Sequence, residues 1–256
     1  MTDRTMGVAA LGVWVCIGAL VLAMAAGCSR QDGEPGNGAA EADKDAQLVD
    51  ARAEDEAEVE LAALPVELPE PAFLGTPAHL KRAGLRLEEN VPDRRPAFYA
   101  PADVENVALG KPVTSSDPFP IIGSLDLVTN GEKGARDGDY VELGFGSQWV
   151  QVDLEEEYDI HAVVFWQRHD QPIVYRAVIV QVSNDPEFEE GVTTLFNNDH
   201  DNRSGHGVGE DYQFVSNHEG KLVDAGGVRA RYVRIYSAGN TLDDFNHFTE
   251  VEVWAR

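Results

Sequence analysis

Two arginines eight positions apart, Arg168 and Arg176, have the types and spacing to bind a small polar ligand. Each guanidinium is a planar fork of donors that can hold hydroxyl groups or a carboxylate through paired hydrogen bonds. Because His169 and Asp170 follow Arg168, donors and acceptors stand side by side, as a polyhydroxylated ligand requires. We expect His200, from a later polar loop, to join them. The alternative is that both arginines simply pair with carboxylates of an acidic domain.

Two polar loops carry histidines together with aspartates and asparagines. They are residues 197–206 and the group Asp243, Asp244, Asn246 and His247. Side chains of these types can hold a transition metal. No tight histidine spacing supports that interpretation, so hydrogen-bonded loops are favoured.

Glu250 and Glu252 alternate on one expected strand, so their carboxylates would lie roughly 7 Å apart on one face. That separation suits an inverting glycosidase, but two residues on one strand cannot flank a bond from opposite sides. The sequence contains no Gly-x-Ser-x-Gly, His-Glu-x-x-His or phosphate-loop motif. We therefore predict no catalytic residue. Residues 103–256 carry 28 carboxylates and 11 basic side chains, which excludes a nucleic-acid partner because no basic face is evident.

The sequence predicts that the elements positioning these residues are β-strands. The segments richest in β-branched and aromatic residues are Trp149–Leu154, His161–Arg168, Tyr175–Ser183, Arg231–Ser237 and Glu250–Trp254. Turn-forming pairs such as Asn130-Gly131 separate them, and no apolar pattern repeats at helical spacing over three turns. The pattern predicts an all-β fold, an antiparallel jelly-roll β-sandwich over residues 103–256.

Six segments, in order along the chain, resemble one protein family. They are Asn106–Ser116, Leu127–Gly131, Trp149–Leu154, Val180–Asp185, Arg231–Ile235 and Thr249–Val253. Together they resemble the discoidin family, also called coagulation factor five/eight type C. From the first segment to the last, the resemblance spans nearly all of residues 103–256. The resemblance implies a galactose-binding-like jelly roll of two antiparallel sheets, which binds glycans, lipid head groups or proteins through loops at one end.

The resemblance also implies a calcium site. Its ligands would be carbonyls near Leu127 and Glu132, the side chain of Asn130, and Glu250. Calcium takes roughly six to eight oxygens, which loop carbonyls and a carboxylate can supply. Asn130 departs from the Asp that the family usually has, and one fewer negative charge weakens the site. The alternative is that Asn130 only forms a turn and Glu250 is an exposed strand residue.

Arg168 falls where sugar-binding relatives carry an Asn-Arg pair. Those relatives add a histidine from an earlier loop, and residues 134–148 contain none. The resemblance therefore implies glycan binding at Arg168, but not a fucose-like specificity.

The N-terminus carries a targeting signal. Residues 7–26 contain no charge, and small residues from Ala25 onward stand directly before Cys28. This arrangement resembles the lipobox of bacterial lipoproteins, in which the cysteine is acylated, and it predicts a signal peptide over 1–27 and lipidation at Cys28. Ala25 departs from the usual Leu, and the alternative is an uncleaved membrane helix.

The segment after Cys28 is acidic. Between Arg30 and Glu70, thirteen carboxylates face three basic residues, and no aromatic residue is present. Such a segment cannot bury enough apolar area to offset its chain entropy. We therefore expect a largely disordered acidic linker over 28–102, of which the stretch Pro96–Pro101 could strap against the domain.

These inferences combine into a membrane-anchored, non-catalytic binding module of the bacterial cell envelope. The expected partner is a glycan bound through the end loops, and a cell-envelope protein is the alternative. Ser29 is not the Asp that retains some lipoproteins at the inner membrane, so we expect the outer membrane, on its periplasmic or surface side.

Overall fold

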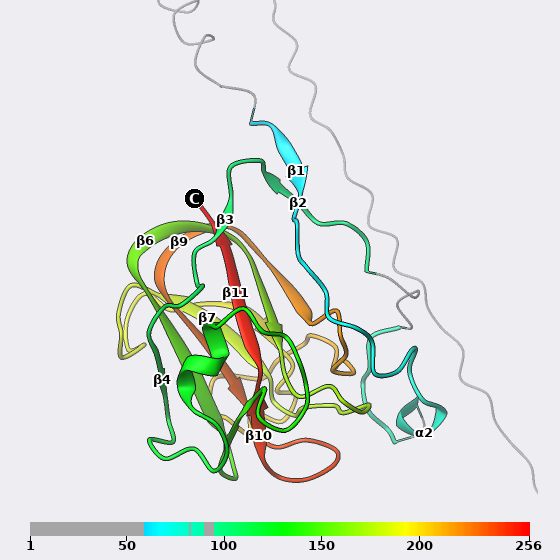
Figure 1. Ribbon diagram of the computed structural model, residues 1–256. Helices are drawn as coiled ribbons and strands as arrows, with labels where there is room; N and C mark the ends of the chain where they lie inside the picture. Colours follow the sequence, from blue (N-terminus) through cyan, green and yellow to red (C-terminus); the bar gives the residue numbers. More distant parts are fainter. Residues whose placement is uncertain (1–58, 82, 90–94) are drawn as a thin grey trace, which may run out of the picture. The chain divides into compact units, whose positions relative to one another are not determined.

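The structure is a computed structural model that describes residues 59–81, 83–89 and 95–256 (Figure 1). These residues belong to one compact unit, Glu58–Arg256. Among them, no helix combines the length and the apolar character that crossing a membrane requires. The predicted signal peptide, the lipidation site Cys28 and the first part of the expected linker lie outside the described residues.

One antiparallel sheet of seven strands forms most of this unit. The strands are β3 (Glu105–Asn106), β4 (Val113–Ser115), β6 (Gln148–Trp166), β7 (Ile179–Ser183), β8 (Thr193–Asn197), β9 (Lys221–Ser237) and β11 (Glu250–Ala255). Their order is β3-β11-β6-β9-β7-β8, and β4 pairs with the first half of β6. Because the sheet folds back on itself, the predicted fold class, an antiparallel all-β sandwich, is confirmed.

β6 and β9 are long enough to enter both layers of the sandwich. Their ladder shifts its register between Asp153 and Tyr158, where Glu155 adopts a positive φ of 70°. Figure 1 shows the two strands curving over together at one end of the domain. Inward side chains from both halves of β6 then share one core: Val150, Val152, Leu154, Ile160, Val163 and Phe165. The segments Trp149–Leu154 and His161–Arg168, expected as two strands, therefore belong to one continuous ladder.

The described residues before 102, which we call the strap, cover the outer face of this sheet. That face carries a second apolar cluster made of Ala162, Val164, Trp166 and Trp254. The strap side chains that pack on the cluster are Leu64, Val66 and Phe98. Trp166 is 1% exposed as a result, although its neighbours Phe165 and Val163 point into the opposite core. Both faces of the second half of β6 are therefore buried.

Main-chain pairing and charged contacts fix the strap. Strand β1 (Leu61–Ala63) pairs antiparallel with β2 (Tyr99–Pro101), and a short helix, α2 (Ala78–Lys81), lies between them in the sequence. The backbone N–H of Arg95 donates to both carboxylate oxygens of Glu219, at 2.9 Å each. The Arg95 Nη1 group also donates to the carbonyl of Glu219 at 2.9 Å. The strap is thus bonded to the sandwich as well as packed on it.

The observed unit therefore begins earlier than the predicted boundary at residue 103. The linker expected over 28–102 is too long, because its second half packs against the sheet. Its apolar residues stand singly among prolines and carboxylates, so no periodic pattern reveals them. Their partner surface, around Trp166, lies far away in the sequence. The expectation that Pro96–Pro101 straps against the domain agrees with the position of Phe98.

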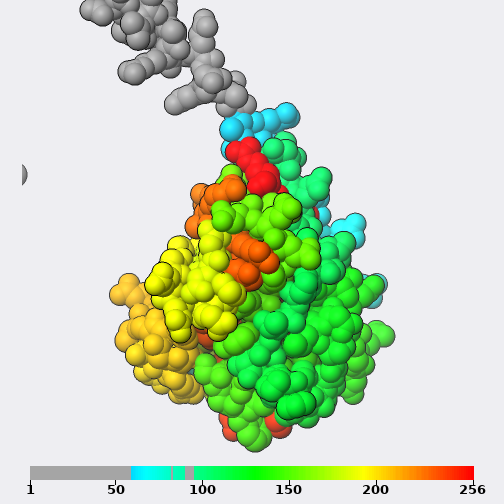
Figure 2. All heavy atoms as spheres, turned by 90° about the vertical axis from the view of Figure 1, so that its left-hand side faces the viewer, coloured from blue at the N-terminus to red at the C-terminus, as the bar shows by residue number. Residues whose placement is uncertain are grey.

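The connecting loops gather at the end of the domain opposite to the C-terminus (Figure 1). There, β5 (Val141–Leu143) pairs with β10 (Asn246–Phe248), and the 3-10 helix η1 (Leu125–Thr129) leads into the turn at Asn130. Figure 2 shows the other end, where the first strap residues (cyan) lie beside the last residues of the chain (red). The loops and the two ends of the described chain therefore occupy opposite poles.

Candidate functional site

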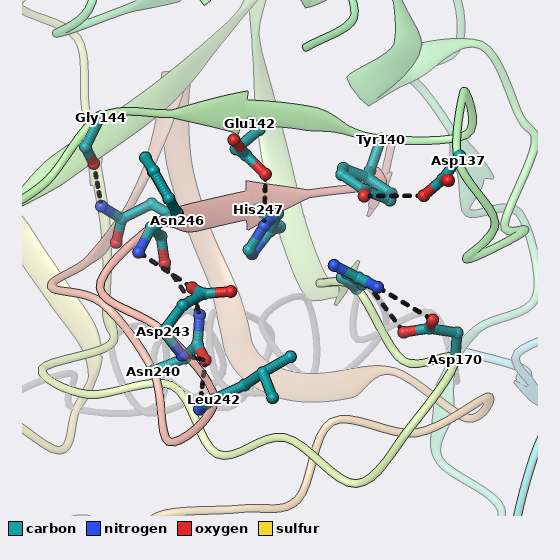
Figure 3. Close-up of polar contacts among 12 residues, drawn as sticks. Asp137, Tyr140, Glu142, Gly144, Asp170, Asn240, Leu242, Asp243, Asn246 and His247 are labelled. Carbon is teal, nitrogen blue, oxygen red and sulfur yellow. Dashed lines mark hydrogen bonds and ion pairs between the residues drawn. The ribbon is translucent and has the colours of Figure 1, made fainter. Parts of the chain in front are cut away.

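The short β5–β10 pair builds the floor of a site at the loop end (Figure 3). The register of this pair places His247 opposite Glu142. The ring of Tyr140, one residue before β5, meets the His247 ring edge-on, with the centroids 5.2 Å apart. Tyr175 approaches the same imidazole from the loop after β6, with the ring centroids 6.0 Å apart. We call these four residues the floor.

The floor is held by a buried chain of hydrogen bonds. His247 is fully buried; its Nε2 lies 3.0 Å from Glu142 Oε2, and its Nδ1 lies 2.9 Å from the Tyr175 hydroxyl. Burial lowers the pKa of His247 despite the neighbouring Glu142, and burial raises the pKa of Tyr175. A neutral imidazole therefore donates a hydrogen bond from Nε2 to the carboxylate and accepts one from the tyrosine hydroxyl at Nδ1. Both ring nitrogens are occupied, which assigns His247 a positioning role.

Arg168 lies on top of this floor. Its Cζ atom is 5.3 Å from the centre of the Tyr140 ring. Its Nε and Nη2 groups donate to the two oxygens of Asp170 at 2.9 and 3.1 Å, and this pairing raises the pKa of Arg168. No hydrogen bond from Nη1 to another described residue is present. One edge of the guanidinium is therefore fixed, and the other edge remains for a ligand.

Arg176 forms a second charged pair at the same end. Its Nη1 lies 3.3 Å from Asp244 Oδ1, and its backbone N–H donates to the carbonyl of Gly239 at 2.9 Å. The side chains of Arg176 and Asp244 are 36% and 78% exposed, so this pair is open to solvent. The loop that carries Asp244 is braced by Asn246, whose side-chain amide donates to the carbonyl of Gly144 at 2.7 Å (Figure 3).

An apolar ledge adjoins these charges. Phe145 follows β5 and Phe245 precedes β10, and their ring centroids are 4.5 Å apart. Phe145 is 65% exposed, and Leu242 in the same loop as Phe245 is 52% exposed. Large exposed apolar side chains that cluster beside polar groups mark interaction sites. The loop that carries Asp244, the partner of Arg176, therefore also carries part of an apolar surface.

Two histidines expected at the ligand site bond to main-chain carbonyls instead. His169 is 2% exposed, and its Nε2 donates to the carbonyl of Lys133 at 3.0 Å. His200 donates from Nε2 to the carbonyl of Asp211 at 2.8 Å within its own loop. Among the described residues, no hydrogen bond or ion pair joins either histidine to Arg168. The structure brings together Arg168 and Asp170, and it pairs Arg176 with an aspartate that was not assigned to the ligand site.

The sequence interpretation missed the residues of the floor as ligand-site residues. His247 was assigned only to a polar loop, and Tyr140 and Glu142 were not singled out. Glu142 and His247 are separated by 105 positions, so local spacing gives no sign that they meet. The available signal was the charged Glu142 between two apolar residues in Val141–Leu143. A polar side chain in a buried strand requires a buried partner.

One of the expected calcium ligands, Glu250, is a buried carboxylate. Glu250 is fully buried, and its Oε2 accepts the backbone N–H of Gly131 at 3.0 Å. Its Oε1 has no hydrogen-bond partner among the described residues. Burial raises the pKa of Glu250 to about 8, and the Gly131 hydrogen bond opposes that shift. Glu250 is therefore not an exposed strand residue, and the interpretation of it as one is wrong.

The residues present fit a hard cation. The orphaned Oε1 belongs to a carboxylate whose other oxygen is held by the turn at Gly131, and main-chain oxygens of such a turn are ligands of a kind that suits calcium. Asn130 Oδ1 accepts the backbone N–H of Glu132 at 2.8 Å, so one of its lone pairs is already used. Within the described ranges, no group of three His, Cys, Asp or Glu side chains is placed to hold a metal ion. Such a site would therefore depend on main-chain oxygens.

The two carboxylates considered for catalysis are both internal. Glu252 is 4% exposed; its Oε1 lies 2.6 Å from Lys133 Nζ, and its Oε2 accepts the indole N–H of Trp254 at 3.1 Å. Glu250 is covered by the turn at Gly131. Neither carboxylate is open to a substrate in this arrangement.

The six segments that resemble the discoidin family all lie in the sandwich. No family model and no curated protein matches the chain. Among solved structures, the chain is similar to a chitosan-binding module of a Paenibacillus chitosanase/glucanase, at 20% identity and a TM-score of 0.43 over 59% of this chain and 99% of the module. It is also similar to a fucolectin from striped bass serum, at 18% identity and a TM-score of 0.44 over 60% of this chain and 49% of the lectin.

A third similar structure is a family 89 glycoside hydrolase from Clostridium perfringens in complex with GlcNAc-α-1,4-galactose. The identity is 20% and the TM-score 0.44, over 59% of this chain. This chain spans only 14% of that enzyme's length.

Proposed function

We propose that this protein is a non-catalytic glycan-binding module. One observation carries the proposal: Arg168 is fixed by Asp170 and Tyr140 so that a single edge of its guanidinium remains available. A guanidinium edge beside carboxylates suits hydroxyl groups, and the Phe145–Phe245 ledge suits the apolar face of a sugar ring. The discoidin-like segments of the sequence support the same interpretation.

The substitution Arg168→Ala should lower glycan affinity at least tenfold and leave the fold intact. A hydrogen bond to a charged group contributes about 1.5–3 kcal/mol, and a shallow sugar site starts from a dissociation constant of about 0.1–1 mM. A glycan array followed by titration calorimetry on the full chain checks this. Arg229→Ala is the matched control, because Arg229 pairs with Glu157 at 3.0 Å next to the register shift of the β6–β9 ladder, at the opposite pole.

Unchanged binding by Arg168→Ala would contradict the site. If that variant unfolds, Arg168→Lys decides instead, because lysine keeps the charge and loses the fork. A second candidate function, docking of a cell-envelope protein, is favoured by exposed apolar residues near the ledge: Phe119 is 83% and Ile121 is 53% exposed. An empty array, together with an envelope protein that the wild type retains and Arg168→Ala releases, would select docking.

Calcium is part of the proposal. Glu250 would supply a carboxylate oxygen, and Asn130 and the carbonyls near Leu127 and Glu132 would supply the remaining protein oxygens. When bound, the ion supplies positive charge that stabilises the turn and the ionised form of Glu250. The protein contributes the position of the carboxylate and its exclusion from water.

Anchoring through a lipid on Cys28 completes the proposal, and it is supported by the small residues before that cysteine. Cells that express the wild type and are fed radiolabelled palmitate should incorporate the label into the protein. Cys28→Ser should lose all of the label, because the sulfur of the Cys28 thiol is the atom that carries the lipid. Cys16→Ser is the matched control and should remain labelled. Equal labelling of the wild type and Cys28→Ser would overturn the lipoprotein assignment.

A further inference from the structure

One turn belongs to both candidate sites. This turn, residues 130–133, contains Gly131, whose N–H donates to Glu250 Oε2 at 3.0 Å. The same turn contains Lys133, whose carbonyl accepts the Nε2 proton of His169 at 3.0 Å. We call it the shared turn. The backbone that faces the cation site is therefore one hydrogen bond away from the residue that follows Arg168.

The side chain of Lys133 anchors the end of the shared turn. Its Nζ lies 2.6 Å from Glu252 Oε1 and 5.3 Å from the centre of the Trp166 ring. The side chains of Lys133 and Glu252 are 11% and 5% exposed, so the ion pair is largely shielded from water. Separating the two buried charges would be costly. A displacement of Gly131 relative to Glu250 would therefore turn the backbone about the anchored Lys133 side chain. Such a rotation would change the direction of the Lys133 carbonyl.

His169 is placed to follow that change. Its ring is buried, and its Nδ1 has no hydrogen-bond partner among the described residues. The bond to the Lys133 carbonyl is thus the hydrogen bond that sets the ring orientation. Arg168 is the preceding residue, and its guanidinium must keep its place above Tyr140 while paired with Asp170. A small displacement of a positioned binding group is enough to change affinity.

We propose that a cation bound at Glu250 repositions Arg168 through the shared turn, with His169 as the positioning residue. This inference rests on the proposed function of the two sites. Linkage then requires that the cation and the ligand raise each other's affinity by the same factor. For a connection that runs through one hydrogen bond, we expect a factor of about five, at the low end of measured couplings.

Calcium alone tests the proposal, without knowledge of the glycan. In the full chain, kept in detergent and labelled with 15N on arginine, the Nε resonance of Arg168 should shift as calcium is added. The shift should saturate together with the calcium-induced rise in melting temperature. The Nε resonance of Arg176 is the internal control and should stay in place, because its contacts to Gly239 and Asp244 do not involve the shared turn.

Two variants separate the positioning role from a merely structural one. His169→Phe removes the donor and should still bind calcium, but its Arg168 resonance should no longer respond. His169→Gln keeps a donor near the position of Nε2 and should restore the response. If His169→Phe does not fold, the wild-type titration decides.

An Arg168 resonance that stays fixed while calcium raises the melting temperature overturns the link and leaves the glycan proposal standing. No thermal response to calcium overturns the link together with the cation site. A responsive Arg168 combined with an empty glycan array overturns the proposed function and leaves the link standing.

Discussion

The affinity of the protein for calcium should increase about tenfold for each pH unit between about pH 6 and pH 8, and level off above that range. The cause is Glu250, because burial raises its pKa to about 8. Below that pH the carboxyl group is mostly protonated, so an ion that binds the carboxylate must release one proton. Titration calorimetry at a series of pH values measures the slope. An affinity independent of pH would show that Glu250 is not a ligand.

The same carboxyl group sets the pH dependence of stability in the presence of a chelator. The pKa of Glu250 in the folded protein, about 8, lies above its ordinary value of 4.5, so the folded state binds the proton more tightly. This contribution to the free energy of unfolding is fully present below about pH 4.5 and is lost as the pH rises through about 8. Calcium should restore the loss by mass action.

Glu250→Gln is the matched control for both measurements. The amide resembles the protonated carboxyl group in shape and carries no charge at any of these pH values. Between about pH 5 and pH 8, the variant in chelator should therefore lose less stability than the wild type. Its melting temperature should also no longer respond to calcium. A calcium response retained by Glu250→Gln would place the ion elsewhere.

A chain that begins at residue 103 should be less stable than one that begins at Glu58 by about 3–5 kcal/mol. The shorter chain loses the three apolar anchors of the strap and uncovers Trp166 and Trp254, each of which is less than 9% exposed. Denaturant unfolding measures the difference. The tryptophan fluorescence of the shorter chain should move to longer wavelength as the indole rings meet water.

Single substitutions show whether packing causes this loss. Phe98→Ala should produce an intermediate destabilisation, because Phe98 packs on the cluster that contains Trp166. Leu61→Ala is the control, since Leu61 is 60% exposed and its truncation leaves no cavity. Equal stability of the two chains would mean that the strap rests on the sheet without contributing to folding.

The strand segments could be predicted because alternation and turn residues are local properties. The continuity of β6 could not be predicted, because the acidic run that begins at Glu155 interrupts the apolar alternation. The ladder to β9 nevertheless continues beyond a register shift. The strap escaped prediction for a related reason. An isolated Leu64 or Phe98 carries no periodic signal. Each is buried only because it packs on the apolar face around Trp166, which is distant in the sequence.

The contacts in the candidate sites also differ in whether the sequence could predict them. Arg168 and Asp170 are two positions apart and were both assigned to the ligand site; their pairing agrees with the alternative that the arginines pair with carboxylates. Glu142 and His247 come from different strands, and only tertiary structure brings them together. His169 was misplaced because neighbouring residues at a strand end point in different directions. The hydrogen bond to Lys133 takes its ring away from the ligand side.

The candidate ligand site and the ends of the described chain lie at opposite poles of the domain, and this arrangement determines which ligands can reach the site. The described chain enters beside its own C-terminus (Figures 1 and 2), and β10, whose His247 lies in the floor below Arg168, is at the far end (Figure 1). A protein held on its N-terminal side would present those loops outward, with no part of the sandwich between them and the surroundings. Long polymers and glycans fixed to another surface could then be contacted end-on, as readily as a small dissolved sugar.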